Sequence, residues 1–226
     1  MKYLIHCCNK RLWYVNDYLI PSLVEQGIDR EDIIVYNDEN NDGNLTSWYK
    51  SCQYVRDNLE LYDGCWHLQD DVLICKDFKE RTKNPPLNDI VCGYVGKFDI
   101  EDGHDLKGKQ NISCMPYSFQ CIWIPNRFIY GFVNWFEREV ISGKRMQFYY
   151  KRNKYDDFFF KKFMTMEHKY TFSYALEENL VEHIDYIIGG AIVNPYMLRK
   201  KLNNTAVNFK DKDLVEKLKI EMEGRL

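Results

Sequence analysis

Apolar residues recur with two different spacings in the first part of the chain, which predicts strands that alternate with helices. The predicted order is a strand over 2–8, a helix over 11–28, a strand over 32–38, a helix over 45–59 and a strand over 64–69. A further short extended segment is expected over 72–75. Gly27 is a suitable helix stop, and Pro21 should kink the first helix or split it in two. This alternation predicts an α/β fold with a largely parallel sheet.

The second half of the chain is less regular, with strands and helices in mixed order. We expect strands over 89–96, 118–125 and 170–176, and helices over 127–142, 155–166 and 211–226. The last of these is amphipathic, with Leu214, Leu218 and Met222 on one stripe. We therefore predict a single domain over 1–210, with halves at about 1–100 and 101–210, followed by a C-terminal helix over 211–226.

Polar side chains gather where the predicted strands end. His6, Asp38, Asp70 and Asp71 all fall there. In parallel sheets, ligands bind beyond the carboxyl ends of the strands. Two adjacent carboxylates repel each other unless a cation lies near them, and hard divalent ions prefer such oxygens. The alternative is that one aspartate caps the next element while the other faces water.

Two further features could carry chemistry. His183, in "NLVEHIDYIIGG", could bind a divalent ion, or it could be a structural histidine with its partners in the core. Asp156 and Asp157 open a predicted helix. They could cap that helix, or one of them could act as a general base whose pKa is raised by aromatic surroundings.

Composition narrows the class of protein. A net charge of -3 argues against a surface that binds nucleic acid throughout, although 145–163 and 198–201 are locally basic. The 8 cysteines include no C-x-x-C pair, which argues against a zinc ribbon and favours free thiols in a reducing cytoplasm. We expect no signal peptide, because the first apolar run is too short and no small-residue cleavage site follows it, and no apolar run has membrane-spanning length. Kinase and dinucleotide-oxidoreductase glycine motifs are missing.

With these residues in place, the chain resembles GT-A-fold glycosyltransferases over about residues 2–194. In that family a short acidic motif at a strand end holds a divalent ion on the diphosphate of a sugar nucleotide, and "CWHLQDDV" is similar to that strand and motif. The resemblance implies that Asp71 binds metal and that Asp70 contacts the donor, with Gln69 in place of an expected acid.

Other segments resemble the family in the same order along the chain. Asp38 matches an acidic residue that contacts the base, and Gly43-Asn44 matches a turn before the next helix. His6 and Arg11 lie where donor contacts are usual. Asp157, with Asp156 second, matches the catalytic base of inverting members. His183 matches a histidine that completes the metal shell.

The resemblance implies a hexosyltransferase that uses Mn²⁺ or Mg²⁺. The first half would bind a nucleotide-diphosphate sugar, with a UDP-sugar expected, and the second half a hydroxyl acceptor such as a saccharide or a modified DNA base. Three alternatives stay open. The chain could be a phage-type glycosyltransferase of hydroxymethylpyrimidines in DNA, a nucleotidyltransferase, or a non-catalytic nucleotide-binding module.

Overall fold

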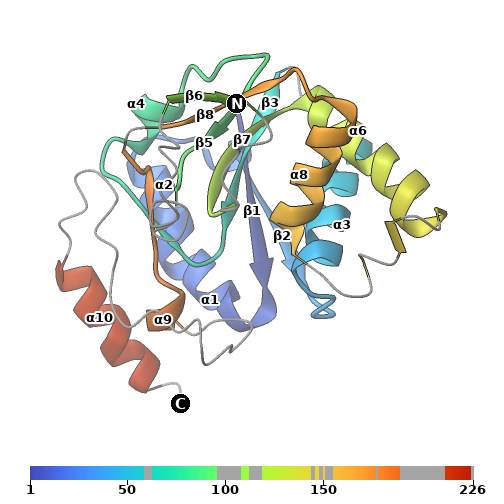
Figure 1. Ribbon diagram of the computed structural model, residues 1–226. Coiled ribbons are helices and arrows are strands. Elements are labelled where there is room, and N and C mark those ends of the chain that lie inside the picture. Colours follow the sequence, from blue (N-terminus) through green and yellow to red (C-terminus); the bar gives the residue numbers. More distant parts are fainter. Residues whose placement is uncertain are drawn as a thin grey trace.

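A seven-stranded sheet with helices on both faces forms the centre of this α/β protein (Figure 1). The structure is a computed structural model that describes residues 1–58, 63–95, 108–111, 119–143, 146–147, 150, 155–176, 178–188 and 212–224. The strands are β1 (Lys2–Cys8), β2 (Ile33–Asp38), β3 (Gly64–Gln69), β5 (Ile90–Cys92), β6 (Gly108–Asn111), β7 (Cys121–Pro125) and β8 (Phe172–Ala175). Their spatial order is β2-β1-β3-β7-β5-β8-β6.

The sheet is mixed in strand direction. The β1–β2, β1–β3 and β5–β8 ladders are parallel, whereas β3–β7, β5–β7 and β6–β8 are antiparallel. The prediction of parallel pairing therefore holds for the three N-terminal strands, and the described second half adds antiparallel neighbours. The carboxyl ends of β1, β2 and β3 consequently meet at one edge, as the sequence predicted.

Helices cover the two faces separately (Figure 1). One face carries α1 (Leu12–Tyr14), the π-helical turn η2 (Val15–Leu19) and α2 (Ile20–Glu25). The other carries α3 (Asn44–Asn58), α6 (Asn126–Phe136) with the π-helical η5 (Glu137–Ile141), and α8 (Asp156–Glu167). Short elements are the 3₁₀ turns η1 (Asn9–Arg11) and η3 (Arg30–Asp32), and the helices α4 (Phe78–Thr82) and α9 (Asp185–Ile188).

The first predicted helix changes type before its proline. The chain winds as a π-helix over η2 and returns to an α-helix at Ile20, so that Pro21 lies in the first turn of α2. Leu19 and Ile20 keep right-handed helical dihedrals, so the helix continues through this point, and the π-helical turn lies where the proline removes a backbone N–H donor. The predicted kink or split thus takes the form of a change in helix type.

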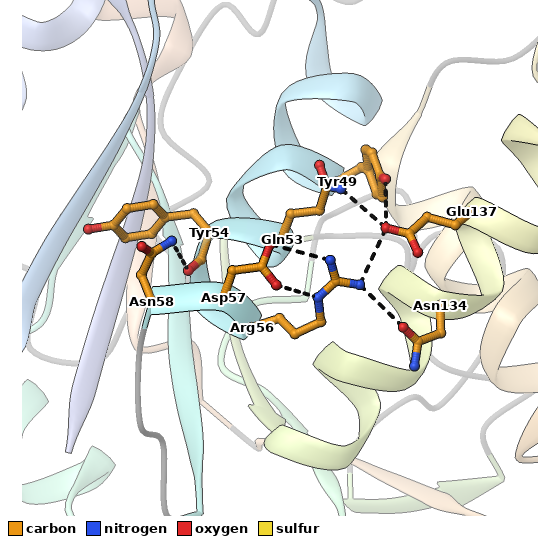
Figure 2. Close-up of polar contacts among 8 residues, drawn as sticks. All are labelled: Tyr49, Gln53, Tyr54, Arg56, Asp57, Asn58, Asn134 and Glu137. Atoms are coloured by element: carbon orange, nitrogen blue, oxygen red, sulfur yellow. Dashed lines mark hydrogen bonds and ion pairs between the residues drawn. The ribbon is translucent and has the colours of Figure 1, made fainter.

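Aromatic packing fixes the layer of α3, α6 and α8 on the sheet. The Trp48 ring lies 4.6 Å from Phe132 and 5.2 Å from Phe160, measured between centroids, and all three side chains are buried. On the outer side, Glu137 of η5 accepts hydrogen bonds from Gln53 (3.2 Å) and Arg56 (3.3 Å) of α3 (Figure 2). These contacts fix α8 against α3 and α6 through the Trp48 ring.

Close contact between β3 and β7 requires a glycine. A Cβ atom on Gly64 would lie 2.6 Å from the carbonyl oxygen of Ile124 and 2.7 Å from Trp123. Neither the buried backbone nor the buried indole can move away easily. Gly64 therefore allows the antiparallel pairing that joins the two halves of the sheet.

A second, two-stranded sheet links distant segments. β4 (Val72–Ile74) starts directly after Asp71 and pairs antiparallel with β9 (Val181–His183). The extended segment after Asp71 is a confirmed prediction, whereas β6, β9 and α4 were not predicted. The C-terminal helix is confirmed as α10 (Lys212–Glu223), which packs on α9 and buries Leu218 completely.

Candidate functional site

A cavity of about 370 Å³ opens at the carboxyl ends of β1, β2 and β3. Small-molecule sites are typically about 300–1,000 Å³. The cavity is lined by every residue that the sequence singled out, namely His6, Arg11, Asp38, Asn44, Gln69, Asp70, Asp71, Asp156, Asp157 and His183. These residues span the chain from β1 to β9, and the fold brings them together.

The acid pair shares one guanidinium. Arg11 Nη2 lies 2.7 Å from Asp70 Oδ1, and Arg11 Nη1 donates to Asp71 Oδ2. The backbone N–H of Cys8 donates to Asp70 Oδ2 at 2.8 Å. All three charged side chains are buried, and two carboxylates so placed need such a cation. Both oxygens of Asp70 are thus engaged by the chain itself.

The two aspartates respond differently to this environment. Burial raises the pKa of Asp70 to about 6, in spite of Arg11. Burial would also raise the pKa of Asp71, but Arg11 and His183 outweigh that effect and hold it below its usual range. Asp71 is therefore the more firmly ionised member of the pair.

The small sheet explains how His183 reaches the acid pair. His183 pairs with Val72 in the β4–β9 ladder, and the N–H of Ile184 donates to the carbonyl oxygen of Asp71 at 2.8 Å. His183 Nε2 consequently lies 3.1 Å from Asp71 Oδ2. Asp185, at the start of α9, lies 3.9 Å from the same ring nitrogen.

The loop after β2 is folded around Asp38. Asp38 Oδ1 accepts the backbone N–H of Asp42 at 3.0 Å, and Gly43 has a φ of 88°, which favours glycine. Asn44 then begins α3 beside the cavity. The loop therefore forms one wall of the cavity and brings polar groups from Asp38 to Asn44 to its surface.

His6 is held neutral on this wall. Its Nε2 lies 2.5 Å from Ser47 Oγ of α3. Burial lowers the pKa of His6 to about 4, and Arg11 adds to that effect while Asp38 opposes it. A neutral imidazole at pH 7 can donate or accept a hydrogen bond, but it supplies no positive charge to a ligand.

Asp156 and Asp157 begin α8 on the opposite side of the cavity. Asp156 is buried, its Oδ1 accepts the N–H of Asp157 at 3.0 Å, and its buried Oδ2 has no hydrogen-bond partner. Burial raises the pKa of Asp156 to about 6, with a smaller contribution from Asp71. Asp157 Oδ1 accepts the N–H of Phe158 at 2.6 Å. Asp156 thus has a buried, unpaired carboxylate oxygen with a raised pKa, while Asp157 caps the start of its own helix.

Sequence reasoning missed several residues of the lining. Cys8, Ser47, Gln120, Tyr155 and Asp185 all line the cavity. Asp185 follows His183 by two residues and Tyr155 precedes Asp156. Their closeness to predicted site residues could have identified both of them as part of the site. Gln120 had none, because only the antiparallel β3–β7 pairing places it beside Gln69. The basic segment 198–201 and most of 144–154 lie outside the described residues.

Carboxylates dominate the charge of the described lining. The acids are Asp38, Asp70, Asp71, Asp156, Asp157 and Asp185, and Arg11 is the single Lys or Arg beside them. An anionic ligand would be repelled by this set unless a further cation came with it. The charge balance thus favours a ligand that carries a divalent ion, or a neutral one.

The donor set fits such an ion in part. Asp71 Oδ1 and Asp185 Oδ1 are buried without hydrogen-bond partners. The 3.1 Å between Asp71 Oδ2 and His183 Nε2 matches neighbouring ligands of an octahedral ion, which lie about 3 Å apart. In the described parts of the chain, however, no three acidic, cysteine or histidine side chains are already arranged to hold a metal. Arg11 occupies the carboxylates instead.

Comparison with models of protein families, with curated proteins and with solved structures gave no match for this chain. Among the helices that the structure describes, none combines the length and apolar composition needed to cross a bilayer. The geometry of the cavity therefore carries the functional argument alone.

Proposed function

We propose that the protein is a glycosyltransferase that moves a hexose from a nucleotide-diphosphate sugar, a UDP-sugar in our expectation, to a hydroxyl acceptor. The observation that carries the proposal is the convergence of ten sequence-predicted residues on one cavity at the carboxyl edge of the sheet. Chance placement would have scattered residues chosen from five separate segments, which are 6–11, 38–44, 69–71, 156–157 and 183. The proposal includes the GT-A fold family, the transferase activity and the hydroxyl acceptor.

The donor would lie along the edge of β1, β2 and β3. The loop from Asp38 to Asn44 offers polar groups for the base and ribose, and Arg11 is the guanidinium closest to a diphosphate in that position. Asp71 and His183, with Asp70 beside them, would hold Mn²⁺ or Mg²⁺. A bound ion of this kind would neutralise charge on the leaving diphosphate.

The acceptor would be activated by Asp156. Asp156 lines the cavity, its buried Oδ2 has no hydrogen-bond partner, and its raised pKa suits an exchange of protons near neutral pH. The acceptor oxygen attacks the anomeric carbon, the bond from that carbon to the phosphate oxygen breaks, and the hydroxyl proton moves to Asp156. The products are a glycoside and a nucleoside diphosphate, with inversion at the anomeric carbon.

A panel of sugar nucleotides tests this function without a known acceptor. The protein is incubated with each donor, with and without Mn²⁺, and slow hydrolysis is followed with water as the acceptor. Release of nucleoside diphosphate from at least one donor supports the proposal. Release of pyrophosphate in the presence of nucleoside triphosphate and sugar phosphate would instead identify a nucleotidyltransferase. Nucleotide binding without any turnover would indicate a non-catalytic module.

A further inference from the structure

Arg11 occupies the position that a divalent ion would need. Its two terminal nitrogens reach one oxygen of Asp70 and one oxygen of Asp71, and the guanidinium is buried between them. Asp71 Oδ2 also receives His183 at 3.1 Å. An ion that bound Asp71 through Oδ2, next to His183, would therefore compete directly with Arg11 for that oxygen.

Free coordination capacity remains beside Arg11. Asp71 lines the cavity and is more than nine-tenths buried, and its Oδ1 has no hydrogen-bond partner. Asp185 Oδ1 is likewise buried without a hydrogen bond, 3.9 Å from His183 Nε2. A buried carboxylate oxygen without a partner is unfavourable, so these atoms favour a cation that would satisfy them.

Charge balance shows why Arg11 would have to move. One guanidinium already shares its single charge between Asp70 and Asp71. It cannot hold both carboxylates and also neutralise a diphosphate. If a divalent ion takes over Asp71, the guanidinium is released on the cavity side, where planar bidentate contacts to phosphate are its preferred geometry.

We propose that Arg11 is an exchangeable internal cation, which bridges Asp70 and Asp71 in the ligand-free protein and yields Asp71 to a divalent metal ion, so that its guanidinium can bind the donor diphosphate. The diphosphate part rests on the proposed function, whereas the exchange at Asp71 does not. The exchange makes metal binding and nucleotide binding mutually favourable, because each ligand favours the same position of Arg11.

The exchange is tested with Mn²⁺ alone, without nucleotide and without an activity assay. Mn²⁺ affinity is measured by electron paramagnetic resonance at pH 7.5 for the wild type and for Arg11→Gln. Removal of the competing cation should tighten Mn²⁺ binding by about ten-fold or more. The double variant Arg11→Gln, Asp71→Asn should lose that gain. Arg138→Gln, which removes a guanidinium from exposed surface ion pairs, is the matched control and should bind Mn²⁺ as the wild type does.

Equal or weaker Mn²⁺ binding by folded Arg11→Gln would overturn the proposal, and so would a gain that survives Asp71→Asn. If Arg11→Gln does not fold, Arg11→Lys replaces it. Lysine keeps the charge but cannot bridge two carboxylates with a planar fork, so tighter Mn²⁺ binding than in the wild type is again expected. Unchanged affinity in Arg11→Lys would contradict the exchange. Because no donor is present, these outcomes are independent of whether the protein transfers sugars.

Discussion

At the scale of single residues, the site contains titratable side chains whose pKa values burial has shifted. Asp70 and Asp156 both have a pKa raised to about 6, while that of His6 falls to about 4. Strong shifts of this kind cluster at functional sites, although structural ion pairs also produce them. Here the shifted groups surround one cavity, and this supports a chemical role for them.

Asp156 should impose a pH dependence on turnover. A base must be deprotonated, and a pKa of about 6 means that the active form is lost as the pH falls through 6. We expect kcat/KM for donor hydrolysis to rise about ten-fold per pH unit below 6 and to level off above 7. Asp156→Asn should lower kcat by about 100-fold or more. A flat profile between pH 5 and pH 8 would remove Asp156 from this role.

The same substitution should stabilise the fold. The pKa of Asp156 in the folded protein is raised above its ordinary value of 3.8, so the native protein binds the proton more tightly than the unfolded chain does. Stability therefore falls as the pH rises through 6, where burial of the charge becomes unfavourable. Asn keeps the Oδ1 acceptor for the N–H of Asp157 and never ionises. Urea unfolding at pH 7 should show Asp156→Asn more stable by about 1–3 kcal/mol, with the difference vanishing near pH 4.

At the scale of elements, α8 connects the aromatic layer to the site. Asp156 opens the helix, and Phe160, one turn later, packs against Trp48 at 5.2 Å and Phe119 at 5.5 Å. The orientation of the Asp156 carboxylate therefore depends on how α8 packs. The sequence pattern predicted the helix but not this packing. Which aromatic rings would meet could not be read from the sequence, because the Phe-rich run fits several orientations of the helix.

Truncation of that anchor should affect stability and site together. Phe160→Ala removes a fully buried ring and should destabilise the protein by about 3–5 kcal/mol in urea unfolding. Phe172→Ala is the matched control, since Phe172 is 39% exposed, and its effect should stay below about 1 kcal/mol. Similar losses from both substitutions would show that the layer of α8 is not anchored as described.

Gly64 tests the junction between the halves of the sheet. Alanine would place a Cβ atom against the backbone and indole of β7, and overpacking of this kind destabilises by about 1–3 kcal/mol. A thermal melt of Gly64→Ala should show that loss. A variant as stable as the wild type would mean that β3 and β7 are not so closely spaced.

At the scale of the whole molecule, the sequence predicted the N-terminal half better than the remainder. Alternation of apolar runs predicted β1, β2, β3 and the helices between them, because each element follows from local periodicity. The β4–β9 ladder joins Val72 to His183 and could not be predicted from spacing, since nothing local specifies a partner so far along the chain. His183 was linked to the acid pair by the resemblance to glycosyltransferases and not by the periodicity of apolar residues. The sequence also could not show that Asp156 is buried while Asp157 is half-buried.

The distribution of thiols provides a probe of the entire fold. Of the seven cysteines described, all are free, and Cys8 is the one that is not buried. Burial raises the pKa of Cys8, so alkylation by iodoacetamide should be slow at pH 7 and faster at higher pH. Because Cys114 lies outside the described residues, the experiment uses Cys114→Ser. We expect one modified thiol in the native state, and protection of Cys8 by UDP with Mn²⁺. An unchanged rate with these ligands would place nucleotide binding elsewhere.

The proposed reaction is cleavage of a nucleotide-diphosphate sugar in the cavity, with Asp71 at its centre. The most direct measurement is release of nucleoside diphosphate from the best donor by the wild type, Asp71→Asn and Asp57→Asn. Asp57 pairs with Arg56 on the surface of α3 and is the matched control. We predict steady release by the wild type and Asp57→Asn, and a rate about 100-fold lower for Asp71→Asn. Equal release by the wild type and folded Asp71→Asn, or none from any donor, would contradict the account.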